Sequence, residues 1–126
     1  MQISDAEWIV MNLVWKSSSL EAAEVIEQLA KANGWSAATV KTMLHRLVKK
    51  GALEAEQVGK KYLYQAAVKR EACVREESRS FLERVFGGDA APALIHLVKT
   101  SKLSAKDAEE IREMLDRKFH KSEGAE

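Results

Sequence analysis

The sequence predicts a mainly α-helical protein with one small β-hairpin. Three N-terminal segments repeat their apolar residues at helical spacing, and the segment after them changes to a spacing of about two. The remaining C-terminal half returns to helical spacing. With 126 residues, 46% of them hydrophobic and 31% charged, the chain fits one compact domain or a small domain with a helical appendage.

The first two helices are predicted from their capping signals. A capping-box pattern at residues 4–7 starts a helix over 5–16. The pattern is repeated at residues 18–21 and starts a second helix over about 20–32, which Gly34 ends.

A third helix and a hairpin follow directly. The helix runs from a Ser36 cap to Lys50, and its apolar residues recur at helical spacing. The period then changes, which predicts strands over 53–58 and 62–66 around a turn at 59–61. This order of elements is that of a winged helix-turn-helix, in which the third helix is exposed for recognition and the hairpin is the wing.

The rest of the chain is predicted to be helical, with one helix over about 68–86 and two more that begin at Asp89 and Ser104. Three short amphipathic helices cannot bury their apolar stripes without a partner surface, which favours a homodimer. The sequence thus predicts a winged-helix DNA-binding domain over 1–68 followed by a helical dimerisation domain over 69–126. The residues expected in the dimer interface are Val74, Phe81, Leu82, Val85, Leu94, Leu97, Ile111 and Leu115.

Basic residues are concentrated in one part of the chain, although its net charge is only +1. Residues 35–61 contain six Lys or Arg and two Glu, a net charge of +4 in 27 residues. Such a patch suits a polyanion, and a solvated helix face is the alternative.

The polar side of the third helix has the residue types that read DNA. Lys41 can donate to guanine or to a phosphate, Thr42 can contact a thymine methyl group, and Arg46 can donate to guanine or to the backbone. The first turn of the helix favours a phosphate, and lysines at the wing tip would add further phosphate contacts. The expected DNA-binding residues are Ser36, Thr39, Lys41, Thr42, Arg46, Lys60 and Lys61.

Several classes of protein are excluded by composition. No charge-free stretch approaches the roughly 20 residues of a membrane span, and no secretory signal is readable, so we expect a cytoplasmic protein without membrane insertion. Cys73 alone forms neither an internal disulfide nor a thiolate metal cage, and the three histidines are scattered. No nucleophile elbow or phosphate loop is present, so we expect no enzyme activity, metal or cofactor.

The tryptophans and methionines lie at apolar positions of the predicted helices. We expect them to pack in the core rather than to bind a ligand or a base. They are Trp8, Trp15, Trp35, Met11, Met43 and Met114.

Residues 35–51, WSAATVKTMLHRLVKKG, resemble the recognition helix of the BlaI/MecI/CopY penicillinase repressor family. Residues 4–15, SDAEWIVMNLVW, are similar to the family's opening helix, and residues 81–88 and 103–115 are similar to its C-terminal pattern. The resemblance covers nearly the whole chain. It implies a homodimeric repressor that occupies a palindromic operator in double-stranded DNA.

By motif position, the resemblance places the DNA contacts on Thr39, Lys41, Thr42 and Arg46, with backbone contacts from Ser36 and the wing lysines. Ala38 stands where basic members often have Lys, so we expect a different operator preference. The cysteine-rich tail of the copper-responsive relatives has no counterpart in residues 120–126, which argues against copper sensing.

The signal that relieves repression is less well defined by the resemblance. In antibiotic-responsive members, an Asn-Phe bond in the middle C-terminal helix is cut, and His96 and Leu97 stand at the corresponding positions here. They are the candidate cleavage site for a membrane-bound sensor metalloprotease. Two alternatives stay open, a winged-helix protein-interaction adaptor and a ligand-sensing regulator of the multiple-antibiotic-resistance type.

Overall fold

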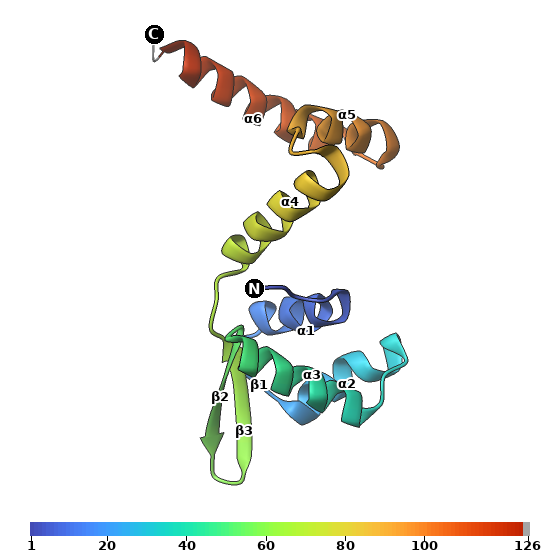
Figure 1. Ribbon diagram of the computed structural model, residues 1–126, viewed down its shortest axis with the longest axis vertical. Helices are drawn as coiled ribbons and strands as arrows, with labels where there is room; N and C mark the ends of the chain where they lie inside the picture. The colour runs from blue at the N-terminus through green and yellow to red at the C-terminus, as the bar shows by residue number, and fades with distance from the viewer. Residues whose placement is uncertain (125–126) are drawn as a thin grey trace. The chain divides into compact units, whose positions relative to one another are not determined.

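The computed structural model describes residues 1–124, and the side chains of residues 1–120. The chain forms two compact units, Met1–Glu77 and Ser78–Glu126. The elements, in chain order, are α1 (Asp5–Lys16), β1 (Leu20–Glu21), α2 (Ala22–Asn33), α3 (Ala37–Lys50), β2 (Leu53–Val58), β3 (Lys61–Ala66), α4 (Arg70–Phe86), α5 (Ala90–Thr100) and α6 (Ala105–Gly124) (Figure 1). The mainly α-helical class with a small β component is confirmed.

The ends of α1 and α3 are set by the residues that the sequence indicated. Ser4 and Glu7 form a capping box, in which the Ser4 hydroxyl accepts from the Glu7 N–H at 3.2 Å and the Glu7 carboxylate accepts from the Ser4 N–H at 2.8 Å. The Ser36 hydroxyl accepts from the Thr39 N–H at 3.1 Å. Gly51, with a φ of 84°, ends α3 in the left-handed conformation that glycine adopts at low cost.

The predicted start of the second helix is wrong. Leu20 and Glu21 form the short strand β1 and pair with Tyr64 and Leu63, so α2 begins only at Ala22. Leu20 is buried in the core, and its extended backbone lets it pair with β3 at the same time. The Glu21 N–H donates to the Glu24 carboxylate at 3.0 Å, so the cap lies three residues later than the serine pattern indicated.

The hairpin therefore belongs to a three-stranded antiparallel sheet with the order β1-β3-β2. Its register joins Leu53 to Ala66 and Val58 to Lys61. Lys61 is the first residue of β3, whereas the sequence placed it in the turn, which here contains Gly59 and Lys60. The β2–β3 hairpin projects away from α1, α2 and α3 as a wing (Figure 1).

The core of the first unit lies between α1, α2, α3 and the base of the wing. Each fully buried leucine or valine contributes roughly 1.5–3 kcal/mol of transfer free energy. Trp15 and Trp35 pack against this core, as predicted, and the Trp15 Nε1–H donates to the Val68 carbonyl at 3.0 Å. The largest fully buried side chains are Val10, Met11, Val14, Val25, Val40, Leu44, Leu47 and Leu53.

The second unit consists of the end of α4 with α5 and α6. Asp89 caps α5, and Ser104 and Asp107 exchange capping hydrogen bonds at the start of α6. Ala93 is the one buried hydrophobic residue among the described residues of this unit. Met114 was predicted to lie in the core and is 60% exposed, because the apolar side of α6 has no covering element within this unit. Within residues 1–124, each helix is too short or too polar to span a membrane.

Candidate nucleic-acid interface

Helix α3 is fixed in the first unit by one apolar face. Val40, Leu44 and Leu47 are completely buried, and Met43 is nearly so. Because these residues recur at spacings of three and four, the opposite face of the helix is left in solvent. The core therefore determines which side chains α3 presents.

The exposed face of α3 carries the predicted DNA-binding residues. Thr39, Thr42 and Arg46 follow one another at spacings of three and four, so they lie along one line of the helix, and Lys41 lies beside that line. All four residues are exposed. Among the described residues, no hydrogen bond or ion pair engages the side chains of Lys41, Thr42 and Arg46. Their donors are available to an external ligand.

The N-terminus of α3 is held by two hydroxyl groups. The Oγ of Ser36 lies 2.9 Å from the Oγ1 of Thr39, in addition to accepting the Thr39 N–H. The N–H groups of Ala37 and Ala38 precede the first intrahelical hydrogen bond, which Val40 donates to the Ser36 carbonyl at 3.2 Å. The helix start therefore offers N–H donors and the positive end of the helix dipole to an anion.

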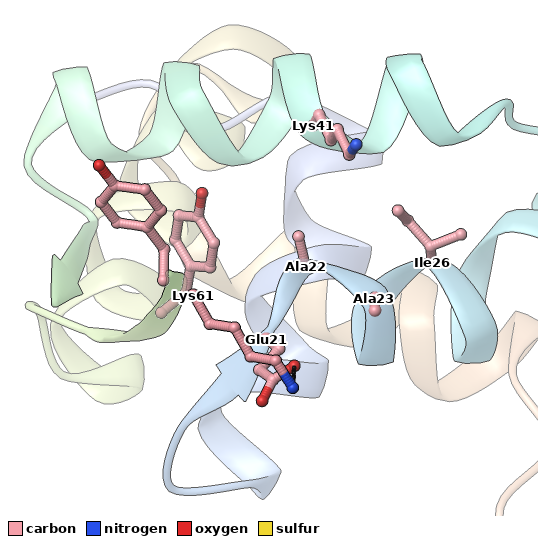
Figure 2. A pocket seen from close by; sticks show the side chains of 8 residues that line it. Glu21, Ala22, Ala23, Ile26, Lys41 and Lys61 are labelled. Carbon is pink, nitrogen blue, oxygen red and sulfur yellow. Dashed lines mark ion pairs between the residues drawn. The ribbon is translucent and has the colours of Figure 1, made fainter. Parts of the chain in front are cut away.

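The two wing lysines differ in their surroundings. Lys60 is exposed in the turn, whereas the Lys61 Nζ lies 3.6 Å from Oε2 of Glu21. Figure 2 shows Lys61 and Glu21 beside an open groove that also has Lys41 on its wall. The structure thus brings a lysine of α3 and a lysine of the wing to one groove, whose full lining is Glu21, Ala22, Ala23, Ile26, Lys41, Lys61, Tyr62 and Tyr64.

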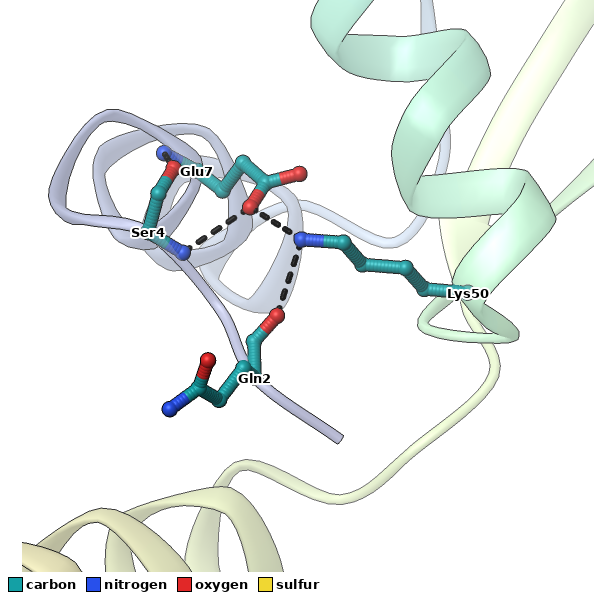
Figure 3. Close-up of polar contacts among 4 residues, drawn as sticks. All are labelled: Gln2, Ser4, Glu7 and Lys50. Carbon is teal, nitrogen blue, oxygen red and sulfur yellow. Dashed lines mark hydrogen bonds and ion pairs between the residues drawn. The ribbon is translucent and has the colours of Figure 1, made fainter.

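One member of the basic patch is engaged in the protein itself. The Nζ of Lys50 donates to Oε1 of Glu7 at 2.6 Å and to the Gln2 carbonyl at 2.8 Å (Figure 3). Glu7 is 3% exposed. Burial by itself raises the pKa of Glu7, but the hydrogen bonds from Lys50 and Ser4 outweigh it and hold that pKa below its ordinary value. This pair could not be predicted from local sequence patterns, because its members lie 43 residues apart.

The predicted dimer residues fall into two groups by exposure. Val74 and Leu82 are half-buried. Further exposed apolar residues of the second unit are Ile95, Val98, Leu103, Met114 and Phe119. Phe119 continues the spacing of four from Ile111 and Leu115 and belongs to the same apolar stripe. The exposed members of the predicted set are Phe81, Val85, Leu94, Leu97, Ile111 and Leu115.

The candidate cleavage residues His96 and Leu97 are exposed in the middle of α5. The His96 carbonyl accepts a hydrogen bond from the Thr100 hydroxyl at 2.8 Å. Proteases bind their substrates as extended strands, so this part of α5 must unwind before the bond can be cut.

No metal site is formed by the described residues, in which no three His, Cys, Asp or Glu side chains come together. Cys73 is buried, and burial raises the pKa of its thiol, with a further increase from the Glu76 carboxylate. Both effects favour the protonated thiol over the thiolate.

Comparison with known proteins agrees with the sequence resemblance. A family model described as penicillinase repressor matches residues 3–117. The penicillinase repressor of Bacillus licheniformis is 36% identical over 115 residues, which cover 91% of this chain and 90% of that protein. The solution structure of the DNA-binding domain of the repressor BlaI is 46% identical, covers 55% of this chain and 84% of that chain, and has a TM-score of 0.52.

A second solved structure shows a related protein bound to DNA. It is the Bacillus licheniformis BlaI monomeric form in complex with the blaP half-operator, which is 45% identical, covers 56% of this chain and 87% of that chain, and has a TM-score of 0.51. The family model and the repressor from Bacillus licheniformis both extend over most of this sequence. The chain therefore belongs to the penicillinase repressor family.

Proposed function

We propose that this protein is a cytoplasmic transcriptional repressor that binds operator DNA as a homodimer, with α3 as the recognition helix. The observation that carries the proposal is the exposed face of α3, where Lys41, Thr42 and Arg46 have free donors on a helix that the core holds in place. The complex of the related BlaI protein with a half-operator supports the same type of partner.

The recognition helix would read bases in the major groove. Arg46 has the forked donors that match guanine, and Thr42 lies one turn before it on the same line. Lys41 and the N-terminal N–H groups of α3 would bind phosphates and fix the register, together with Ser36 and Thr39.

The wing would bind the DNA backbone beside the recognition helix. Among the described residues Lys60 is unpaired, and Lys61 is paired only with Glu21, a half-buried glutamate beside the groove. Phosphate contacts of this kind contribute affinity and salt dependence without reading the sequence.

Dimerisation is proposed for residues 69–126, which include the whole second unit, and DNA binding for residues 1–68. Helices α5 and α6 both leave several large apolar side chains in solvent, which single scattered surface residues do not account for. A second copy could cover this surface with the same residues on both sides, as twofold symmetry requires. Two linked recognition helices would then bind the two halves of a palindromic operator.

Relief of repression is proposed to follow cleavage between His96 and Leu97 by a membrane-bound sensor metalloprotease. The bond lies in α5, one of the two helices that carry the exposed apolar surface. Cutting it would divide that surface between two fragments, and loss of the dimer would release the operator.

The salt dependence of DNA binding tests the proposal. Affinity for a duplex taken from upstream of the protein's own gene is measured between about 50 and 200 mM salt. A dimer that contacts several phosphates per subunit loses affinity steeply over this range, with a logarithmic slope of about −0.9 per phosphate contacted. A flat response, or undetectable binding at low salt, would contradict the proposal and favour a protein-interaction module.

A further inference from the structure

We propose that the Glu7–Lys50 ion pair is a strut that positions the recognition helix, and that both residues act through α3 rather than by contacting DNA. This inference rests on the proposed function, since it concerns how α3 presents its base-reading face.

The strut joins two helix ends that are far apart in the sequence. Lys50 is the last residue of α3, and Glu7 lies in the first turn of α1. The Lys50 ammonium is held by two acceptors, Oε1 of Glu7 and the carbonyl of Gln2. Oε1 of Glu7 also accepts the Ser4 N–H of the α1 capping box, so the strut is built on the start of that helix (Figure 3).

Burial makes this pair sensitive to any movement of α3. The other carboxylate oxygen of Glu7, Oε2, is buried and has no hydrogen-bond partner among the described residues. The charge of Glu7 is therefore compensated mainly through Oε1, and within the part of the chain that the structure describes Lys50 is the one cation bonded to it. If α3 rotates or slides, a nearly buried carboxylate loses its counter-charge, which is strongly unfavourable. The pair thus favours one placement of α3 against α1.

The placement of α3 affects contacts to DNA bases more than contacts to DNA phosphates. Hydrogen bonds to base edges need donor–acceptor distances near 3 Å and good alignment, whereas phosphate attraction tolerates small displacements. Loss of the strut should therefore reduce selectivity before it reduces general affinity for DNA.

The simplest alternative is that Lys50 is a phosphate contact, and it predicts different effects for both variants. In that case Glu7 competes with DNA for the lysine, and Glu7→Gln would strengthen binding to every duplex. Lys50→Met would weaken binding to every duplex alike and lower the salt slope by about one.

The experiment uses the full chain and two duplexes, one selected by the unmutated protein from a randomised library and one with the same bases scrambled. Glu7→Gln and Lys50→Met are compared with Lys49→Met, which removes an exposed lysine from the same helix end. Binding is measured well below the melting temperature of each variant, so that only folded protein is compared.

The strut predicts that Glu7→Gln and Lys50→Met each lower the ratio of selected to scrambled affinity about tenfold and leave the salt slope unchanged. Lys50→Arg is expected to keep the ratio of selected to scrambled affinity, because it keeps the positive charge beside Glu7. The control Lys49→Met is expected to keep this ratio as well. If Lys50→Met does not fold, the double variant Glu7→Gln/Lys50→Met removes both charges and is expected to show the same loss of selectivity.

Stronger binding by Glu7→Gln would overturn the strut, and so would an unchanged ratio in both variants with only a lower melting temperature. Those results would leave the proposed function intact as long as the unmutated protein remains selective. Failure of the unmutated protein to enrich any duplex from the library would instead overturn the proposed function, and the strut with it.

Discussion

The Nζ atom of Lys61 lies 3.6 Å from Oε2 of Glu21, so a carboxylate competes for one of the two wing lysines proposed to bind DNA. The side chains are 71% and 31% exposed, and solvent screening limits such a pair to about 1 kcal/mol or less. A DNA phosphate can therefore displace Glu21 at small cost, and the pair leaves Lys61 available near the groove.

Replacing Lys61 should lower the affinity for DNA, and replacing Glu21 should raise it. Lys61→Ala is expected to weaken binding to all duplexes and to lower the salt slope by about one, because one phosphate contact is lost. Glu21→Gln is expected to strengthen binding to all duplexes slightly. Salt titrations of both variants check this, and an unchanged slope in Lys61→Ala would place the wing away from the backbone.

Residues on the exposed line of α3 should determine base preference. Arg46→Ala or Thr42→Ala is expected to cost about 1–3 kcal/mol on the selected duplex and to relax discrimination, because each removes a contact to a base edge. Competition binding with single-base variants of the duplex measures this, and Thr100→Ala on α5 is the control. Equal losses on selected and random DNA for Thr42→Ala would show that it does not read bases.

Introducing a lysine at position 38 should alter the interface with DNA in a defined way. Ala38 is exposed in the first turn of α3, close to Lys41 and Thr42 in the helix. Ala38→Lys is expected to add a phosphate or base-edge contact, raising the salt slope by about one and changing the duplexes that the protein selects. Selection from a randomised library with both proteins is the measurement; identical preferences and slopes would mean that position 38 does not reach DNA.

Acid should destabilise the first unit through Glu7. The folded-state pKa of Glu7 lies below its ordinary value of 4.5, so its contribution to the free energy of unfolding is fully present above that value. The contribution is lost as the pH falls through the lower folded-state pKa. Glu7→Gln should therefore be less stable than the unmutated protein at pH 7, with a difference that narrows as the pH is lowered.

Denaturant unfolding from about pH 7 to pH 3 measures this difference, since the ordinary Glu titration lies inside that range. The control is Glu27→Gln, which alters an exposed carboxylate on α2. A gap between Glu7→Gln and the unmutated protein that stays constant over the range would show that Glu7 is not the titrating group.

Much of this architecture could be predicted from local signals. Ser4, Ser36, Asp89 and Ser104 begin helices as their capping patterns indicated, because a cap is a contact between residues two or three positions apart. The exposed face of α3 followed from the spacing of its apolar residues.

The features that could not be predicted depend on residues far apart in the sequence or on a surface outside the chain. β1 has two residues, too few to show a period, and it exists because Leu20 pairs with Tyr64 across the sheet. Lys50 was counted in the basic patch, but only the fold brings Glu7 to it. The exposure of Met114 likewise reflects a surface that one chain does not cover by itself.

A charge placed on the apolar side of α6 should separate the proposed dimer. Leu115 is 44% exposed, and in a twofold interface Leu115→Asp would bury a carboxylate from each copy. The variant is expected to sediment as a monomer and to lose operator affinity, since one chain binds only one half-site. Arg117→Asp, on the charged side of the same helix, is the matched control. A Leu115→Asp protein that remains dimeric would place this side chain outside the interface.

The most direct test of the central claim is a gel shift of the purified protein on DNA from just upstream of its own gene, in competition with random DNA at about 0.15 M salt. Selective binding, tighter on the upstream duplex by at least about 10³-fold, is the result expected for an operator-binding repressor. Weak binding that does not distinguish the two DNAs would contradict the assignment of α3 as a recognition helix.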